Sequence, residues 1–441
     1  MTVAVMRTKA EQAYTDQFES VAARLPGGPA VVEARKAAIL AFGGLGLPHR
    51  RIEEFKYTDL RAAFKDVPPP AVNDETAVTA ADLDAALGPL AAVEADRVVF
   101  VNGRYRPELS QVETAKGIDV KPLGTALIEA PHKVAERLTN IHGASDALAQ
   151  LNTAYMTDGA IVRVADGVAA ARPLLLVFAG AGLSQRSVTT RNVVSIGAGA
   201  SVTICEAFVR LAGAADGQSN TLTDIAVGDR AVVTHVKTHT AGHDTHLATW
   251  IIGLGAGSDY RGFQFTESPK LARNQMFVLY QGSGAKLDLS GAFLARGTEH
   301  IDTTLVVDHA EPGCESRELF KGVLDGAARG VFQGKIVVRQ KAQKTDGKQM
   351  AQALMLSENA EFDSKPELEI YADDVVCGHG STSAQLDPDL VFYCRARGIP
   401  EAEARALLTE SFIGEAIDRV EDTPLREALM ETARRWLRTA G

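Results

Sequence analysis

The chain has few cysteines and few aromatic residues. Only four cysteines occur in 441 residues, and none of them forms a CxxC pair. This excludes a disulfide-stapled fold and is typical of a protein from a reducing compartment. Aromatic residues make up 6% of the chain, but the overall hydrophobic share of 46% is ample for a large core and excludes wholesale disorder.

Long apolar runs and a targeting signal are also missing. The N-terminal stretch MTVAVMRTKAEQAYTDQF carries charged and polar residues where a signal peptide needs an apolar segment. The strongest apolar run, residues 173–183, is shorter than the ~20 residues that span a bilayer. We therefore expect no membrane segment and a cytoplasmic location.

The sequence contains neither a nucleotide-binding motif nor a surplus of basic residues. There is no GxxxxGK[ST], and Gly253-Leu254-Gly255 lies between strand-like segments rather than before a helix. Acidic residues outnumber basic ones by 56 to 46, which argues against nucleic acid as a partner. If ATP is used by this system, another chain has to supply it.

Glycine is abundant and recurs at regular intervals. From about residue 160, short Val/Ile/Leu/Thr-rich segments are separated by turns at 196–200, 227–231, 254–258 and 281–285, which recur every 27 to 31 residues. A repeated unit of turn and strand favours a parallel β-helix, which stacks one coil per ~20–30 residues. A β-sandwich is the alternative.

Helical segments flank this β-rich region. The pattern predicts helices within 9–64 and over 80–87, a strand at 97–101 with an Asn102-Gly103 hairpin turn, and helices again after Pro388. The predicted domains are a helical one at 1–95, a mixed connecting segment at 96–157, a β-core at 158–388 and a helical one at 389–441.

One C-terminal helix carries an apolar face. Its members recur at helical spacing and are Leu407, Leu408, Phe412, Ile413, Ile417 and Val420. Either a partner chain covers this face, or the face packs on the protein's own core.

Four histidines form a run between residues 235 and 246. They are His235, His239, His243 and His246. Imidazoles can hold a transition metal, but His235 and His239 would lie roughly 13 Å apart on a strand, too far for one ion. Gly242 turns the chain, so His243 or His246 could face back; hydrogen-bonded histidines are the alternative.

Two further groups could carry chemistry near the end of the β-region. Cys377 and His379 are two residues apart, so they share one face of a strand, and both are good iron ligands. The acidic residues Glu367, Glu369, Asp373 and Asp374 could bind a cation or act on polysaccharide. The alternatives are a buried cysteine with a turn histidine, and a solvated strand face.

Several segments resemble the SufD iron–sulfur cluster assembly proteins. RIEEFKYTDL at 51–60 looks like an N-terminal element of that family, and VFVNGR at 99–104 is similar to another. The similarity continues through RGVFQGKI at 329–336, the loop at 342–349, LEIYADDVVCGHGST at 368–382 and FYCRARGI at 392–399. After C-x-H-G the family usually has Ala-Thr-Val-Gly, whereas this chain has residues 381–384 as STSA.

The resemblance implies a fold and a function. It implies a mainly β protein with a right-handed parallel β-helix core between helical N-terminal and C-terminal domains. It also implies a non-catalytic scaffold subunit of the SufBCD complex for iron–sulfur cluster assembly and transfer. A SufB-like paralogue and a polysaccharide-acting β-helix enzyme are the alternatives.

The resemblance also implies partners and site residues. The β-helix would pair with SufB, and the C-terminal helices would bind the SufC ATPase through the face that contains Leu407, Leu408, Phe412, Ile413 and Ile417. An isolated chain could form a homodimer. His379, with Cys377 beside it, would serve cluster assembly at the SufB interface and hold iron together with partner ligands. We expect no permanent cofactor, only a transient iron or Fe–S cluster shared with SufB.

Overall fold

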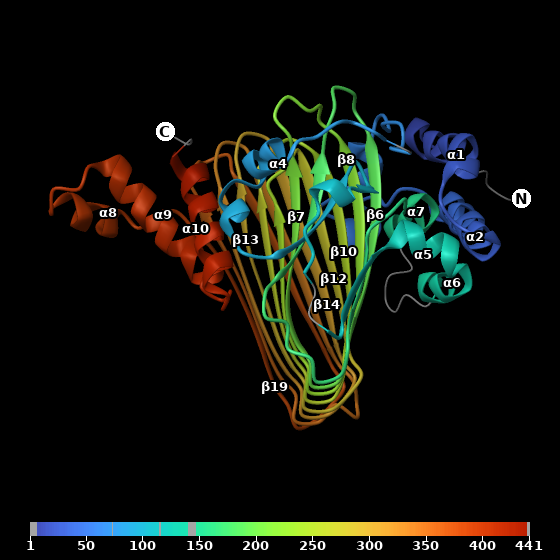
Figure 1. The fold of residues 1–441 in the computed structure, drawn as a ribbon. Helices are drawn as coiled ribbons and strands as arrows, with labels where there is room; N and C mark the ends of the chain where they lie inside the picture. Colours follow the sequence, from blue (N-terminus) through green and yellow to red (C-terminus); the bar gives the residue numbers. More distant parts are fainter. Residues whose placement is uncertain (1–6, 73, 114–115, 140–146, 439–441) are drawn as a thin grey trace, which may run out of the picture.

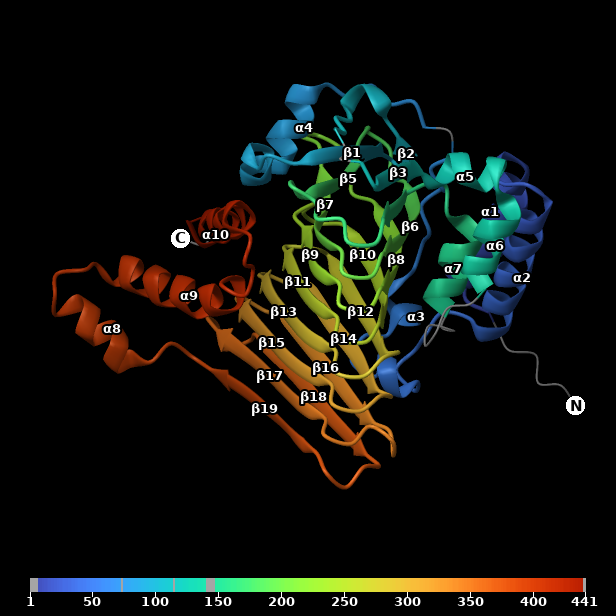
Figure 2. The ribbon, with the colours of Figure 1, turned by 60° about the horizontal axis from the view of Figure 1, so that its bottom comes forward.

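The fold is a stack of parallel β-coils with helices at both chain ends. The computed structural model describes residues 7–72, 74–113, 116–139 and 147–438. From β4 (Ala160–Val164) to β19 (Val376–Ala384), successive strands alternate between two sheets, so each pair of strands makes one coil (Figures 1 and 2). The predicted mainly β fold with a parallel β-helix core is confirmed.

The two sheets run the length of the stack. We call them the even and the odd sheet after the numbers of most of their strands, with β3 and β2 as the exceptions. The even sheet contains β3 (Ile118–Pro122), β4, β6 (Ser187–Ile196), β8 (Gln218–Val227), β10 (Thr245–Leu254), β12 (Leu271–Tyr280), β14 (His300–His309), β16 (Arg329–Val338) and β18 (Glu361–Ile370). The odd sheet contains β1 (Asp96–Val101), β2 (Arg104–Tyr105), β5 (Leu174–Gly180), β7 (Ser201–Arg210), β9 (Val232–His239), β11 (Asp259–Glu267), β13 (Lys286–Ala295), β15 (Glu315–Leu324), β17 (Asp346–Met355) and β19.

Stacked turns explain the regular glycine spacing. Gly199, Gly257 and Gly284 have φ values of 65°, 63° and 68°, in the left-handed region that glycine enters without a Cβ penalty. The backbone N–H of Gly199 donates to the carbonyl of Asp229 in the next coil at 2.8 Å. Arg230 adopts the same conformation at the corresponding turn, with φ 55°. The spacing of the predicted turns is therefore the length of one coil.

Strand residues alternate between the interior and the outside of the solenoid. Neighbouring strands pair in parallel and residue by residue, so each interior side chain stacks on one in the next coil. In the first coils this produces stacked rings, with centroid distances of 5.2 Å for Phe100–Phe178 and 4.7 Å for Phe178–Phe208. The interior is the main hydrophobic core.

Antiparallel strands cover the first coil. The predicted hairpin turn is confirmed, because β1 and β2 pair antiparallel around Asn102 and Gly103, whose φ values are 48° and 73°. On the even sheet, β3 pairs antiparallel with β4. Both sheets therefore end in an antiparallel strand at this side of the stack.

Helices pack on the outer faces of both sheets. A group of helices packs on the outer face of the even sheet near β6 and β8 (Figure 1). These helices come from segments before and after β1 in the sequence. Its members are α1 (Lys9–Val21), α2 (Pro29–Leu45), α5 (Leu123–Glu129), α6 (Pro131–Thr139) and α7 (Ala147–Tyr155), with the short 3-10 helix Ala22–Arg24 after α1. No described helix is both long and apolar enough to cross a membrane.

The outer face of the odd sheet is covered by elements from both chain ends. The first two are α4 (Ala80–Leu87) and the 3-10 helix Gly88–Ala92, and the others are α9 (Glu401–Ile417) and α10 (Thr423–Arg438). By contrast, α8 (Pro388–Arg395) projects away from the solenoid (Figures 1 and 2).

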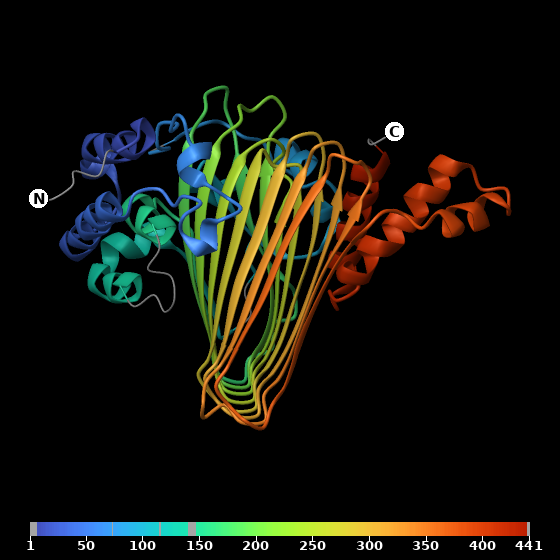
Figure 3. The same ribbon diagram turned by 180° about the vertical axis from the view of Figure 1, so that it is seen from behind.

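Residues 48–60 form a strap across the outside of the even sheet (Figure 3), which includes the 3-10 helix Glu53–Phe55 and leads into α3 (Leu60–Ala63). The Thr58 hydroxyl donates to the carboxylate of Asp302 on β14, which also pairs with Arg273 on β12 at 2.5 Å. Lys365 on β18 forms an ion pair with Glu53 of the strap at 2.5 Å. Residues 51–60 (RIEEFKYTDL), which form most of this strap, therefore join the N-terminal region to the later coils.

Candidate functional site

Cys377 and His379 lie on β19, the last strand of the solenoid. The register pairs them with Gly347 and Gln349 of β17, and both side chains share the interior face. Cys377 packs against the main interior core, and its Sγ lies 3.7 Å from the position that a Cβ on Gly347 would occupy. The two residues therefore line the inner wall at the end of the stack.

The thiol and the imidazole differ in exposure. Cys377 is half-buried, whereas His379 is exposed. Burial raises the pKa of the Cys377 thiol, and the nearby carboxyl groups of Asp346 and Glu318 act in the same direction. The thiol therefore keeps its proton at neutral pH in the isolated chain, and a bound cation would favour the thiolate.

Among the described residues, no strand or helix covers the last coil. In the sheet order, β18 neighbours only β16, and β19 neighbours only β17. Every residue of β18 and β19 is at least partly exposed, whereas most residues of β16 are buried. Apolar side chains are exposed at Ile370 (41%), Tyr371 (62%) and Val376 (62%). Unpaired strand edges beside exposed apolar groups are typical of a surface that pairs with another chain.

The apolar face expected on the C-terminal helix is divided between two environments. Ile413 and Ile417 are fully buried, because α9 packs on β13 and β15 and against α10. Phe412 is half-buried, with the Lys321 ammonium 4.4 Å from its ring centroid. Leu408 is half-buried and Leu407 is 46% exposed. In this conformation Ile413 and Ile417 are therefore not accessible to a partner, and the accessible part of the face is at Leu407.

A second exposed apolar group lies on α8, and the sequence reasoning missed it. Leu390, Phe392 and Tyr393 are 50%, 69% and 55% exposed. The groove beside them is lined by Leu386, Val391 and residues 355–358. The run LVFY at 390–393 was the available signal, because four successive residues point to different sides of a helix and one packed face, here that of Val391, covers only part of them.

The histidine run is mostly inside the solenoid. The chain turns back at Gly242, as the sequence suggests, and the rings of His239 and His246 lie 4.4 Å apart. His235 hydrogen-bonds to the Tyr260 hydroxyl at 2.7 Å, and His243 is exposed. Burial lowers the pKa of His239 to about 3. Within the described ranges, no group of three or more His, Cys, Asp or Glu residues could hold a metal ion. Burial also lowers the pKa of His246, so His239 and His246 are neutral interior groups.

The four acidic residues near β18 lie outside the solenoid or in its last turn. Glu367 pairs with Lys365 at 3.2 Å, Glu369 pairs with Lys335 at 2.5 Å, and Asp374 pairs with a lysine of the neighbouring turn. Asp373 is exposed. Three of the four carboxylates are thus paired with lysines and the fourth is exposed, which is not the arrangement of a facing acid and base in a glycosidase.

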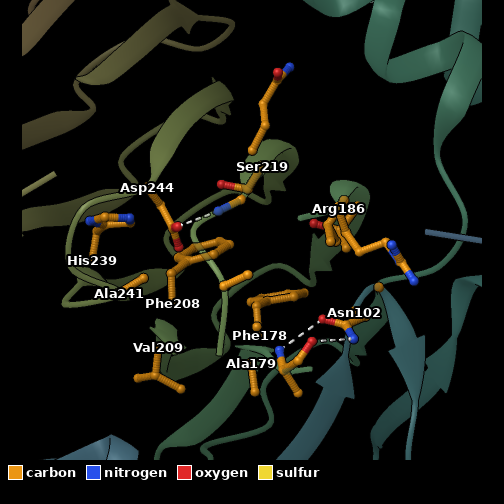
Figure 4. A pocket seen from close by; sticks show the side chains of 18 of the residues that line it. Asn102, Phe178, Ala179, Arg186, Phe208, Val209, Ser219, His239, Ala241 and Asp244 are labelled. Atoms are coloured by element: carbon orange, nitrogen blue, oxygen red, sulfur yellow. Dashed lines mark hydrogen bonds between the residues drawn. The ribbon is translucent and has the colours of Figure 1, made fainter. Parts of the chain in front are cut away.

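A small cavity lies between the turns of the first coils (Figure 4), where the sequence indicated none. Its walls include the rings of Phe178 and Phe208, with Arg186 and Asp244 near them. The Asp244 carboxylate accepts a hydrogen bond from the Gly217 N–H at 2.6 Å, and burial raises the pKa of Asp244 to about 6. This cavity is lined by strands and turns of the first coils, not by the last coil that carries Cys377 and His379.

Family models match nearly the whole chain. A model of the SufBD protein N-terminal region matches residues 8–176, and a model of the SUF system FeS cluster assembly SufBD core domain matches residues 178–412. The chain belongs to the SufBD family of iron–sulfur cluster assembly proteins. The resemblance inferred from the motifs at 51–60 and 368–382 is thereby confirmed.

Three relatives align with this chain over most of their length. An iron–sulfur cluster assembly SufBD family protein of Synechocystis sp. is 32% identical over 88% of this chain and 87% of that protein. The iron–sulfur cluster assembly protein SufD of Escherichia coli is 29% identical over 87% of this chain and 88% of that protein. SufD of Bacillus subtilis is 25% identical over 77% of this chain and 79% of that protein.

Proposed function

We propose that this chain is a non-catalytic scaffold subunit of a SufBCD-type complex in the cytoplasm. In this role it carries a transient iron or Fe–S cluster that it shares with a SufB partner. Family membership supports the proposal, and one observation of the fold carries it. Cys377 and His379 line the interior of the end of the solenoid that no strand or helix of the described chain covers. A thiol and an imidazole are common ligands of iron and of Fe–S clusters.

The exposed edges of β18 and β19 support pairing with the β-helix of SufB. Parallel coils of a homologous chain can continue both sheets and satisfy the backbone groups that the last coil leaves unpaired. Two side chains cannot complete a four-coordinate iron site, so the partner supplies the remaining ligands. The same edges would support a homodimer when the chain is isolated.

The C-terminal helices support docking of the SufC ATPase. Their accessible apolar side chains are Leu390, Phe392, Tyr393 and Leu407. These residues lie on α8 and on the part of α9 that is not buried against β13 and β15. An ATPase bound there would act on α8, the helix that projects from the solenoid (Figure 2).

The test is a His379→Ala variant that is co-expressed with its partners and purified without oxygen. We expect an unchanged subunit ratio, with bound iron and sulfide reduced by about tenfold or more, since loss of a ligand costs at least as much as loss of its supporting shell. Ser383→Ala is the matched control, because Ser383 lies on the same strand and face and is also exposed. Normal cluster content in the His379→Ala complex would refute the proposed site.

A further inference from the structure

A cavity of about 140 Å³ lies on the outer face of the odd sheet, where helices from the two chain ends meet. Its floor is formed by β9 and β11, one side by α4 with the 3-10 helix Gly88–Ala92, and the other side by α10 (Figures 1 and 2). A cavity of about 150 Å³ can hold benzene, so this one has room for roughly six non-hydrogen atoms. The cavity is therefore large enough for a small organic molecule.

Two polar side chains on the floor of the cavity lack a partner. The register pairs Thr238 on β9 with Phe265 on β11, so Glu267 lies on the same outer face, two residues further along β11. Thr238 is fully buried, and its hydroxyl has no hydrogen-bond partner among the described residues. Within the same part of the chain, no ion pair or hydrogen bond involves the half-buried carboxyl group of Glu267. Buried polar atoms are almost always satisfied by protein, water or a ligand, so both groups can bind a polar occupant.

The guanidinium group of Arg435 supplies a positive charge at the edge of the cavity. Arg435 lies in the last turn of α10 and is exposed, so the cavity reaches the surface there. One of its Nη atoms lies 3.1 Å from the position that a Cβ on Gly88 would occupy, so glycine leaves room for the guanidinium group. Among the described residues, Arg435 pairs with Glu431 through Nε at 3.7 Å. Both Nη atoms can therefore bind a carboxylate.

Most of the remaining wall is apolar. Leu87, Leu90, Phe265 and Leu429 line the cavity and are buried. A carboxyl group on the floor and a guanidinium group at the edge match a ligand that carries both an ammonium group and a carboxylate. A simple cation would leave the guanidinium group unmatched, and a simple anion would be repelled by the carboxylate. An α-amino acid carries both charges on one carbon, and alanine is of the size that the cavity holds.

We propose that Glu267, Thr238 and Arg435 form a binding site for a small α-amino acid with an apolar side chain, such as alanine. The Glu267 carboxylate and the Thr238 hydroxyl bind the ammonium group, and Arg435 binds the carboxylate. The apolar side chain lies against Phe265 and Leu429. The site is independent of the proposed function, because it lies outside the solenoid, whereas the proposed cluster site lies in the interior.

The test is ligand-observed NMR of the full chain with L-alanine at pH 8. Burial raises the pKa of Glu267 to about 7, so most of this carboxyl group is ionised at pH 8. Ethylammonium and propionate each keep one charge of alanine. Both should bind at least about tenfold more weakly, because a hydrogen bond between charged groups is worth more than one tenfold step in affinity. L-Phenylalanine is larger than the cavity and should not displace L-alanine.

Variants of the full chain assign the binding to this cavity. Glu267→Gln should raise the dissociation constant of L-alanine at least about tenfold, and Arg435→Gln, at the exposed edge, about fivefold. Arg438→Gln is the matched control, because Arg438 is also an exposed arginine of α10 that pairs with Glu431 but does not line the cavity. Thr238→Val keeps the shape of the side chain and should weaken binding about threefold without lowering Tm, since the hydroxyl has no partner in the free chain.

The possible outcomes separate the site from the identity of its ligand. Absence of saturable L-alanine binding to the wild-type chain, or an unchanged dissociation constant in Glu267→Gln, would overturn the site. Ethylammonium that binds as tightly as L-alanine would overturn the α-amino acid as the ligand. A lower Tm of Thr238→Val would show that the hydroxyl has a structural role instead. Thermal unfolding checks that each variant folds, and if a charge variant does not fold, the comparison of the three probes on the wild-type chain still decides.

Discussion

The first and last coils of the solenoid end in different ways. At the first coil, β2 and β3 pair antiparallel with their neighbours, and the interior is filled by the rings of Phe100, Phe178 and Phe208. At the last coil, the edges of β18 and β19 are bare, and the interior wall carries Cys377 and His379. A covered edge satisfies its backbone groups, whereas a bare edge offers them to another chain. We therefore expect the first end to stabilise the chain and the last end to bind the proposed partner, and we call them the stabilising end and the interacting end.

The helices repeat this contrast. The N-terminal helices pack on the even sheet, and the strap at 48–60 fastens them to the later coils through the buried Arg273–Asp302 pair. The C-terminal α8 carries exposed aromatic side chains instead. Removal of either Arg273 or Asp302 would leave the other buried charge without a partner. The pair therefore fixes the position of the strap relative to β12 and β14.

The largest expected effect tests the stabilising end. Phe178→Ala removes a ring stacked between two others and should lower the free energy of unfolding by about 3–5 kcal/mol. Phe362→Ala, at the last coil, removes a half-buried ring with one ring neighbour, Phe293 at 6.3 Å, and should cost less than about 2 kcal/mol. Urea unfolding followed by circular dichroism measures both. Equal losses would mean that the two ends contribute alike to stability.

The next effect tests the polar interior near the last coil by its response to pH. Burial raises the pKa of Glu318 from its ordinary 4.5 to about 8, so the folded chain holds this proton more tightly than the unfolded chain. Its contribution to stability is full below about pH 4.5 and is lost as the pH rises through about 8. The slope that it adds is at most about 1.4 kcal/mol per pH unit. Glu318→Gln should remove this slope, and parallel curves for variant and wild type from pH 5 to 8 would contradict the prediction.

His239 provides the opposite case in the coils nearer the first end. Burial lowers its pKa from 6.5 to about 3, so its contribution to stability is present above pH 6.5 and is lost as the pH falls towards 3. His239→Asn should flatten the acid side of the stability curve and leave the alkaline side unchanged. Urea unfolding at a series of pH values measures this change. Loss of the alkaline slope in His239→Asn would show that His239, and not Glu318, causes the pH dependence on the alkaline side.

Local spacing in the sequence was enough to predict the stack of coils. Each turn at 196–200, 254–258 and 281–285 contains a glycine whose left-handed conformation closes one coil. The shared face of Cys377 and His379 also followed from the period of two in a strand. The register that places His379 beside Gln349, and Gln349 beside Glu318, could not be predicted, since it joins strands that lie a full coil apart. A change of one residue in a turn would place these side chains on the outside.

Helical periodicity had a similar limit on α9. It identified an apolar face, but it did not indicate which part of that face the chain's own sheet would cover. Ile413 and Ile417 are buried because α9 packs on β13 and β15, and this contact joins residues about 100 positions apart in the sequence. Leu407, on the same helix, lies beyond the sheet and stays exposed.

The smallest effect on stability is expected at the interacting end, together with a large effect on binding. Leu407→Asp changes an exposed side chain and should alter the free energy of unfolding by less than about 0.5 kcal/mol. It should nevertheless abolish capture of the ATPase by the full chain, since a charge in an apolar contact has to be desolvated without a partner. Leu40→Asp is the matched control, because Leu40 is 78% exposed on α2 at the other side of the molecule. Affinity co-purification with the co-expressed ATPase measures the difference. Equal capture by the two variants would show that α9 is not the docking helix, and the distinction between a stabilising and an interacting end would then rest on the bare strands alone.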